Sequence, residues 1–250
     1  MLKLTFLVFG TLMLFSIAPT FANDPLDEDT FEFSEPSKSD LGASLKLWAT
    51  YYYLPEIAED SGTYPLRDIK GQELGPRLTL KHWCDTAMEG SVKINYKNGD
   101  AKTFNYHNVT TDFFVDCKSI FPRHSGIGKT KFREANGVYG DGLDDYVLSP
   151  YRTLATDGTF IKPGTALYIP RARGAKIVLK NGRTIIHDGY FFAADKGGAI
   201  KGAHVDVYIG VSKAASFFPW IGSTESKTFE AFVVKDAKVI ADLLQLHTIR

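Results

Sequence analysis

The most informative stretch of the chain is Ala193-Ala-Asp195-Lys-Gly-Gly-Ala-Ile-Lys-Gly-Ala-His-Val-Asp206-Val-Tyr208. Apolar residues alternate with Asp206 and Tyr208 at its end, which predicts a strand with one face in the core and the acid on the other face. The glycines between Asp195 and Asp206 permit a tight backbone excursion. We therefore expect both acids to converge on one cleft.

Two nearby carboxylates push their pKa values apart, and a partly desolvated one stays protonated and can act as an acid. The alternative is that both aspartates cap turns or pair with Lys196 and Lys201. The residues alone leave both interpretations open. Lys196, next to Asp195, favours the ionised form of that acid and makes it the less suitable proton donor of the two.

Outward from this stretch, the chain reads as short β segments separated by turns. Asn98-Gly99 and Asn181-Gly182 each lie between two alternating segments, which predicts two hairpins over 92–106 and 176–186. Only Lys235 to His247 has helical periodicity, with Val239, Ile240, Leu243 and Leu244 on one face. Many short strands with glycine turns predict a mainly β, closed or nearly closed structure with a C-terminal helix.

The residues from Tyr151 to Ile209 resemble the 3D domain, named for three aspartates, of MltA-type lytic transglycosylases. Asp157 precedes Phe160-Ile161-Lys162-Pro163-Gly164-Thr165, a strand ending in Tyr168-Ile169-Pro170 follows, and then comes the run from Asp195 to Gly202 with Asp206 after it. The segment Trp48-Ala49-Thr50-Tyr51-Tyr52 resembles the family's first barrel strand. The resemblance implies a double-psi β-barrel over 41–250, with a loop-rich segment inserted at about 85–150.

The resemblance also implies cleavage of the MurNAc–GlcNAc β-1,4 bond of peptidoglycan with a 1,6-anhydro product. On this basis, Asp206 is the expected proton donor and base, and Asp195 the neighbour that tunes it. Asp157, Lys201, Thr50 and Tyr51 are the expected substrate-binding or orienting residues. This chemistry uses one acid–base group, so we expect no cofactor and no metal ion. The expected partner is a glycan strand, bound by a monomer.

Two other functional classes compete with this interpretation. A barrel of the same fold could hold glycan without cutting it, because fold does not determine function. An aspartic protease is disfavoured, because neither Asp195 nor Asp206 lies in an Asp-Thr-Gly sequence.

The N-terminus has the pattern of a secretory signal peptide. Lys3 precedes an apolar run from Leu4 to Ile17, and small residues follow up to Ala22, where we expect cleavage. An uncleaved anchor is the alternative, although the run is shorter than the about 20 residues that a membrane span needs. We therefore expect a secreted or periplasmic protein without stable membrane insertion. Residues 23–40 carry seven acids and one base, which predicts a mobile acidic tether.

The chain has 29 basic and 29 acidic residues, so its overall charge does not indicate a nucleic-acid binder. Apolar residues make up 44%, enough for a folded core. Its two cysteines, Cys84 and Cys117, are expected to form a disulfide in an oxidising compartment. Two buried free thiols are the alternative, while a zinc site that uses His82 lacks the usual ligand spacing.

Overall fold

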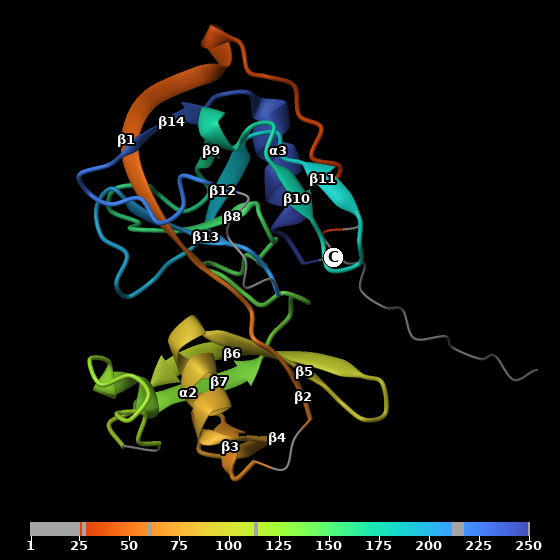
Figure 1. The fold of residues 1–250 in the computed structure, drawn as a ribbon, viewed down its shortest axis with the longest axis vertical. Coiled ribbons are helices and arrows are strands. Elements are labelled where there is room, and N and C mark those ends of the chain that lie inside the picture. Colours follow the sequence, from red (N-terminus) through yellow and green to blue (C-terminus); the bar gives the residue numbers. More distant parts are fainter. Residues whose placement is uncertain (1–25, 27–28, 60–61, 113–114, 212–217, 250) are drawn as a thin grey trace, which may run out of the picture.

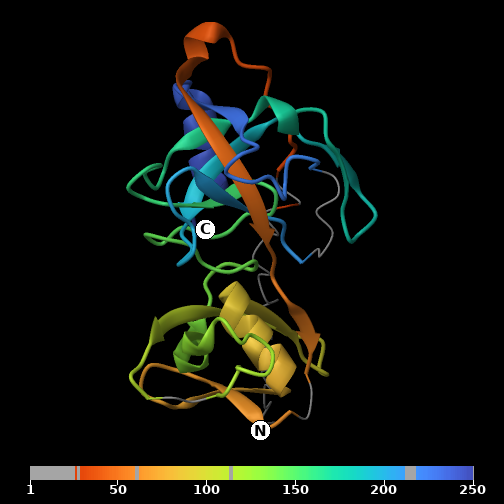
Figure 2. The same ribbon diagram turned by 60° about the vertical axis from the view of Figure 1, so that its left-hand side comes forward.

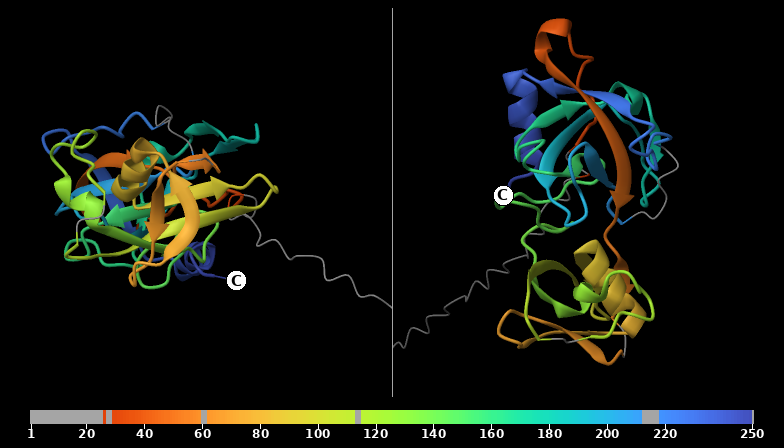
Figure 3. Two further views of the ribbon diagram at one scale, coloured as in Figure 1. Left: turned by 90° about the horizontal axis from the view of Figure 1, so that it is seen from below. Right: turned by 90° about the vertical axis from the view of Figure 1, so that its left-hand side faces the viewer.

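The computed structural model describes residues 26, 29–59, 62–112, 115–211 and 218–249 (Figure 1). The predicted signal peptide and its cleavage site at Ala22 lie outside these residues. The described chain forms a barrel and a smaller part below it, and two chain segments join the two parts (Figure 3). Among the described helices, none is long and apolar enough to cross a membrane.

Six strands form a closed barrel in the order β1-β13-β8-β12-β9-β14. Their bounds are β1 (Leu41–Tyr52), β8 (Thr153–Thr156), β9 (Ala166–Tyr168), β12 (Tyr190–Asp195), β13 (His204–Tyr208) and β14 (Phe229–Val234). The pairs β1–β13 and β8–β12 are parallel, and the other pairs are antiparallel. Alternate residues such as Leu47, Phe191 and Val207 are fully buried inside. The prediction of a mainly β protein is confirmed.

The C-terminal helix α3 (Ala237–Leu246) packs outside the barrel (Figure 1). Asp236 begins it by accepting hydrogen bonds from the backbone N–H groups of Lys238 and Val239. Leu243 is fully buried, while Leu244 from the same predicted face is 41% exposed. The helix is confirmed, and its buried stripe is narrower than the sequence pattern predicts.

The smaller part contains a four-stranded sheet in the order β2-β5-β6-β7. Its elements are β2 (Glu56–Ala58), β3 (Tyr64–Arg67), β4 (Glu73–Leu78), α2 (Leu80–Glu89), β5 (Ser91–Asn95), β6 (Ala101–Val109), η2 (Ser125–Lys129) and β7 (Thr130–Glu134). The chain enters it directly from the end of β1 (Figure 2). It has its own core, in which Trp83, Phe104 and Phe132 are fully buried.

This arrangement corrects the expected boundary of the insertion. The smaller part begins near Glu56, about thirty residues before the expected start at 85, because β2 pairs with β5 and the β3–β4 hairpin contributes to the same core. Apolar residues of 56–84 complete the core of the segment expected at about 85–150, so the insertion is larger than the resemblance implied.

Both predicted hairpins are confirmed. Strands β5 and β6 pair around Gly99, and β10 (Lys176–Val178) pairs with β11 (Thr184–Ile186) around Gly182. Gly99 and Gly182 have φ of 93° and 84°, the left-handed region that favours glycine in such turns. Two further short 3₁₀ segments are η1 (Lys38–Asp40) and η3 (Pro170–Ala172).

Asp29 and Phe31 are buried against the barrel, which corrects the prediction of a mobile acidic tether for this part of 23–40, while residues 23–25 and 27–28 lie outside the described residues. Asp29 is only 4% exposed and forms an ion pair with the fully buried Arg152, whose second partner is Asp188. The Phe31 ring lies 4.1 Å from the guanidinium carbon of Arg152. Composition alone predicted a solvated segment because the buried arginine that its acid meets lies 123 residues away in sequence.

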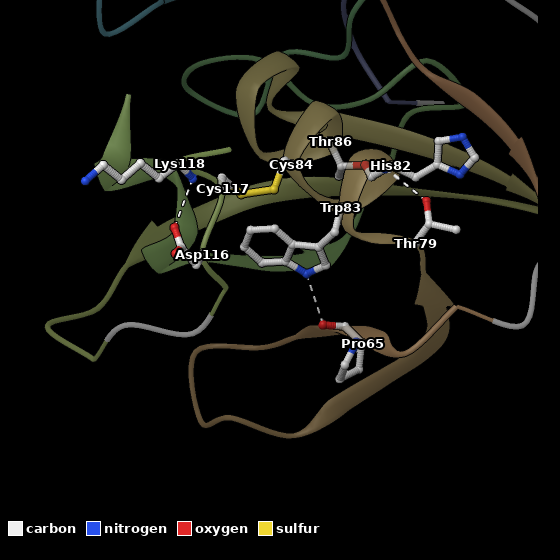
Figure 4. Close-up of a disulfide and its surroundings, with 9 residues drawn as sticks. All are labelled: Pro65, Thr79, His82, Trp83, Cys84, Thr86, Asp116, Cys117 and Lys118. Atoms are coloured by element: carbon white, nitrogen blue, oxygen red, sulfur yellow. Dashed lines mark hydrogen bonds between the residues drawn. A yellow bond between two sulfur atoms is a disulfide. The ribbon is translucent and has the colours of Figure 1, made fainter. Parts of the chain in front are cut away.

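The disulfide between Cys84 and Cys117 is present, as predicted. It joins helix α2 to the segment before η2, next to the indole of Trp83 (Figure 4). The Trp83 indole N–H donates to the carbonyl of Pro65 and so ties the helix to the β3–β4 hairpin. The smaller part is therefore cross-linked across its own core.

We expect the double variant Cys84→Ala/Cys117→Ala to unfold at lower denaturant concentration than the wild type. The bond closes a loop of 33 residues, which corresponds to about 3–4 kcal/mol of stability in the chain-entropy account. Chemical denaturation followed by tryptophan fluorescence measures the loss. An unchanged midpoint would show that the bond adds nothing to the folded protein.

Candidate functional site

The two aspartates of the 193–208 stretch flank the same residue of the barrel. Asp206 on β13 is paired with Ala155 of β8, and Asp195 at the end of β12 is paired with Ala155 from the opposite side. Neighbouring strands lie about 4.8 Å apart, so the two backbones are roughly 10 Å apart. On its other side, Asp206 is the register partner of Thr50 on β1. The acids therefore occupy fixed positions on the barrel wall.

Asp206 is a largely buried carboxyl group with a single side-chain donor beside it. The Thr50 hydroxyl donates to Asp206 Oδ1 at 2.8 Å when the carboxyl group is ionised. Burial raises the pKa of Asp206 to about 6, and the hydrogen bond from Thr50 opposes part of that rise. Near neutral pH this group thus exists in both protonated and ionised forms, as an acid–base catalyst must.

Asp195 is half-buried, and two donors hold its carboxylate. The Tyr52 hydroxyl donates to Oδ2 at 2.7 Å, and the backbone N–H of Lys196 donates to Oδ1 at 2.8 Å. Burial nonetheless raises the pKa of Asp195 to about 6, against the lowering by these two hydrogen bonds. The charge of Lys196 lowers the pKa of Asp195, in the direction expected from the sequence, but desolvation is the larger effect and sets the net rise.

Asp157 differs from the other two acids. It is half-buried, and its carboxylate accepts hydrogen bonds from the backbone N–H of Gly202 and from the N–H and hydroxyl of Thr159. These bonds, with Lys201 nearby, lower the pKa of Asp157 to about 2. Asp157 is thus ionised at neutral pH, and its bond to Gly202 fixes the glycine-rich loop that precedes β13.

A cavity of about 640 Å³ lies between the barrel and the smaller part and contains all three acids. Lys201 lines it on the barrel side. Thr50 does not line it and acts on the site through Asp206. Tyr51 does not line it either, and its side chain is 40% exposed. Of the predicted site residues, the cavity brings together Asp157, Asp195, Lys201 and Asp206.

Several lining residues were not predicted. Tyr52 could have been identified from the sequence, because it shares a strand face with Thr50 and β1 pairs with β13 in register. Glu89, Asn105 and Arg133 come from the smaller part and face the acids across the cavity. No sequence signal pointed to them, since their place in the site depends on how the two parts pack.

The connection that returns from the smaller part to the barrel passes directly beside Asp195. The backbone N–H of Leu143 donates to the carbonyl of Ala194 at 2.8 Å. A Cβ on Gly142 would lie 2.1 Å from the same carbonyl oxygen, so only glycine permits this approach. Asp141, which ion-pairs with Arg133 at 2.7 Å, holds the same connection from the other end.

A second cavity of about 490 Å³ lies beside the β10–β11 hairpin. Glu56 is the one carboxylate among its described lining residues, and it is paired with Lys180. Within the described ranges, no group of three or more His, Cys, Asp or Glu side chains is placed to hold a metal ion. The cavity with the three aspartates is the better candidate for acid–base chemistry.

We expect Tyr52→Phe to raise the pKa of Asp195 further. The variant removes the hydroxyl that donates to the ionised carboxylate and leaves the burial unchanged. Carboxyl-carbon NMR titration of aspartate-labelled protein measures the shift, and Tyr53→Phe, at the residue that follows β1, is the matched control. An Asp195 pKa that does not move would show that Tyr52 only fills space.

Residues 152–218 match the 3D domain family. The fold is similar to that of a crystal structure of Escherichia coli MltA with bound chitohexaose, at 18% identity over 76% of this chain and 72% of that chain, with a TM-score of 0.53. A membrane-bound lytic murein transglycosylase from Agrobacterium tumefaciens matches at 14% identity over 78% and 75%, with a TM-score of 0.48. A search of curated protein sequences finds no match.

Proposed function

We propose that this 3D-domain protein with an MltA-like fold is an exported lytic transglycosylase. It cleaves the MurNAc–GlcNAc β-1,4 bond of peptidoglycan and leaves a 1,6-anhydro product, and it acts as a monomer without a cofactor. The observation that carries the proposal is Asp206, a carboxyl group fixed on the barrel wall, largely buried, with a pKa near 6 and open to a cavity. The signal-like sequence over 1–22 supports export to the periplasm or beyond.

In the proposed mechanism, protonated Asp206 donates its proton to the glycosidic oxygen as the bond from that oxygen to C1 of MurNAc breaks. The Asp206 carboxylate then accepts the proton of the MurNAc C6 hydroxyl while O6 bonds to C1. The proton balance of Asp206 closes in each turnover, and no water enters the product. Asp195 keeps the local potential negative as positive charge develops on the sugar ring.

The cavity has the features that a glycan needs. Lys201 and Asp157 at its barrel edge and Arg133 on the opposite side offer hydrogen-bond donors and acceptors to sugar hydroxyls and amides. The chitohexaose bound to the E. coli protein of similar fold supports the same ligand class for this chain. We also propose that the closed barrel, with its two parallel strand pairs, is of the double-psi type.

A glycan-binding barrel without catalysis is the second candidate, and the hydrogen bonds that already occupy Asp195 favour it. Incubation of purified sacculi with the mature protein, followed by mass spectrometry of the soluble products, separates the two. Released anhydro-muropeptides support the transglycosylase. Intact sacculi that sediment with the protein support the binder and contradict catalysis.

A further inference from the structure

His204 lies two residues before Asp206 on β13, and both side chains are on the same strand face. The register of the parallel pair places His204 opposite Trp48 and Asp206 opposite Thr50. The rings of His204 and Trp48 are stacked, with centroids 3.6 Å apart and an interplanar angle of 6°. The imidazole is therefore held in one orientation beside the candidate acid.

A continuous chain of short contacts runs from His204 to Asp206. His204 Nε2 lies 2.7 Å from Thr50 Oγ1, and the same oxygen lies 2.8 Å from Asp206 Oδ1. The imidazole is also hydrogen-bonded to the backbone carbonyl of Ala199. A carbonyl can only accept, and Nε2 already faces Thr50, so we assign the proton of the neutral ring to Nδ1.

Two contacts remain, Nε2 to Oγ1 and Oγ1 to Oδ1, and each needs one proton. The Thr50 hydroxyl supplies one. The second proton belongs either to His204, which is then a cation beside an ionised Asp206, or to Asp206, which is then protonated beside a neutral His204. Burial of two opposite charges is costly, so the neutral arrangement is favoured. In that arrangement, Thr50 donates to His204, and protonated Asp206 donates to Thr50.

We infer that His204 is a positioning residue that acts through Thr50 to hold Asp206 in its protonated form. Neutral His204 accepts a hydrogen bond from the Thr50 hydroxyl, so Thr50 Oγ1 presents only a lone pair to Asp206. That lone pair can accept a hydrogen bond from protonated Asp206 but cannot donate one to the ionised carboxylate. After Asp206 has given its proton away, rotation of the Thr50 hydroxyl toward it stabilises the carboxylate.

The charged and titratable groups that face this chain line the cavity from both parts of the protein. From the smaller part and its connection they are Glu89, Arg133 and Asp141, and on the barrel side Lys196 is next to Asp195. Tyr52 lies next along β1, Asp195 ends β12, and Asp157 with Lys201 lies on the loops at the cavity edge. The neighbouring Ala155 and Thr156 of β8 carry no charge. Burial lowers the pKa of His204, and the Ala199 carbonyl opposes this only in part. The imidazole is thus neutral near pH 7, as the inference requires.

The inference rests on the proposed function only in giving Asp206 a catalytic role, and it can be tested without measuring peptidoglycan cleavage. Nitrogen NMR of histidine-labelled protein, with the His204 signals assigned by their loss in His204→Gln, reports which ring nitrogen is protonated. We expect a proton on Nδ1 and an unprotonated, hydrogen-bonded Nε2 near pH 7. A proton on Nε2 at that pH, with Nδ1 bare, would overturn the proton count.

The second readout is the pKa of Asp206 by carboxyl-carbon NMR. His204→Phe keeps a ring against Trp48 but frees the Thr50 hydroxyl for the carboxylate, so the Asp206 pKa should fall by about one pH unit, a tenfold change in acidity. His204→Gln keeps an acceptor and should restore the wild-type value. If His204→Phe does not fold, His204→Leu takes its place: the Asp206 pKa should be lower in His204→Leu than in His204→Gln.

Thr50→Val tests whether His204 affects the pKa of Asp206 through the Thr50 hydroxyl. In that background, His204→Phe and the parent should give the same Asp206 pKa, because the connecting hydroxyl is gone. An equal fall in both backgrounds, or no fall in either, contradicts the inference. If these shifts appear while sacculi stay intact, the proposed cleavage fails and the role of His204 stands.

Discussion

Asp206→Asn is expected to reduce release of anhydro-muropeptides from sacculi by about 10²–10⁴-fold, the usual contribution of general acid–base catalysis. Asparagine is nearly the same size and can still accept a hydrogen bond from Thr50. It can neither give an acidic proton to the glycosidic oxygen nor take one afterwards. Wild-type activity should itself decline as the pH rises through about 6, because the protonated form of Asp206 is then lost.

Two matched substitutions define the specificity of that loss. Asp242→Asn removes an exposed carboxylate on α3, far from the cavity lining, and should leave the rate unchanged. Asp195→Asn should be less severe than Asp206→Asn, although coupling between the two acids narrows the difference. Wild-type cleavage by Asp206→Asn, measured on protein with an unchanged melting temperature, would remove Asp206 from the mechanism.

Arg152→Leu is expected to cost about 3–5 kcal/mol of unfolding free energy at neutral pH, because it leaves buried carboxylates without their counter-ion. Arg152 is fully buried and donates to both oxygens of Asp29 and of Asp188. Chemical denaturation measures the loss. The N-terminal segment around Phe31 should also become more accessible to protease in this variant, since Arg152 is the buried ion-pair partner of Asp29 and its guanidinium packs on the Phe31 ring.

The pH dependence of this variant identifies the cause. Burial alone would raise the pKa of Asp188, but the hydrogen bonds and charge of Arg152 outweigh it, so the folded-state pKa is lowered. A lowered folded-state pKa stabilises the protein above the unfolded pKa of about 3.9 and ceases to do so as the pH falls through the folded value. Without Arg152, the buried acids protonate more readily, so the difference between variant and wild type should narrow on acidification.

Lys81→Ala is the matched control for the ion-pair prediction. Its pair with Asp85 is an exposed i,i+4 pair on α2, worth about 0.3–0.5 kcal/mol. A loss in Arg152→Leu no larger than in this control would show that the buried cluster contributes little.

The sequence predicted the barrel side of the site well because its determinants are local. Asp206 alternates with apolar neighbours on one strand, and the glycine run before it needs a tight turn, so both features can be read within sixteen residues. Because side chains alternate between the two faces of a strand, Tyr52 faces Asp195, whereas Tyr51 points away and does not line the cavity. The disulfide was likewise predicted from the sequence. Thr50 was expected to bind substrate, but it contacts Asp206 and does not line the cavity.

The remaining features depend on contacts between distant segments. Arg133 and Glu89 reach the cavity only because the smaller part folds around its own core and packs beside the barrel. In the sequence, nothing distinguishes Asp29 from the other acidic residues of 23–40, and only the folded barrel shows that it forms an ion pair with Arg152. Lys196 lowers the pKa of Asp195 as expected, but the larger rise comes from burial, and burial is a property of the fold.

The most direct measurement of the central claim is digestion of sacculi in water enriched in oxygen-18, with mass spectrometry of the released muropeptides. Cleavage by Asp206 with closure of the MurNAc C6 hydroxyl onto C1 predicts products lighter by one water than hydrolytic ones, without label at C1. Products with a reducing MurNAc end that carries the heavy oxygen would contradict the account, because water would then be the nucleophile.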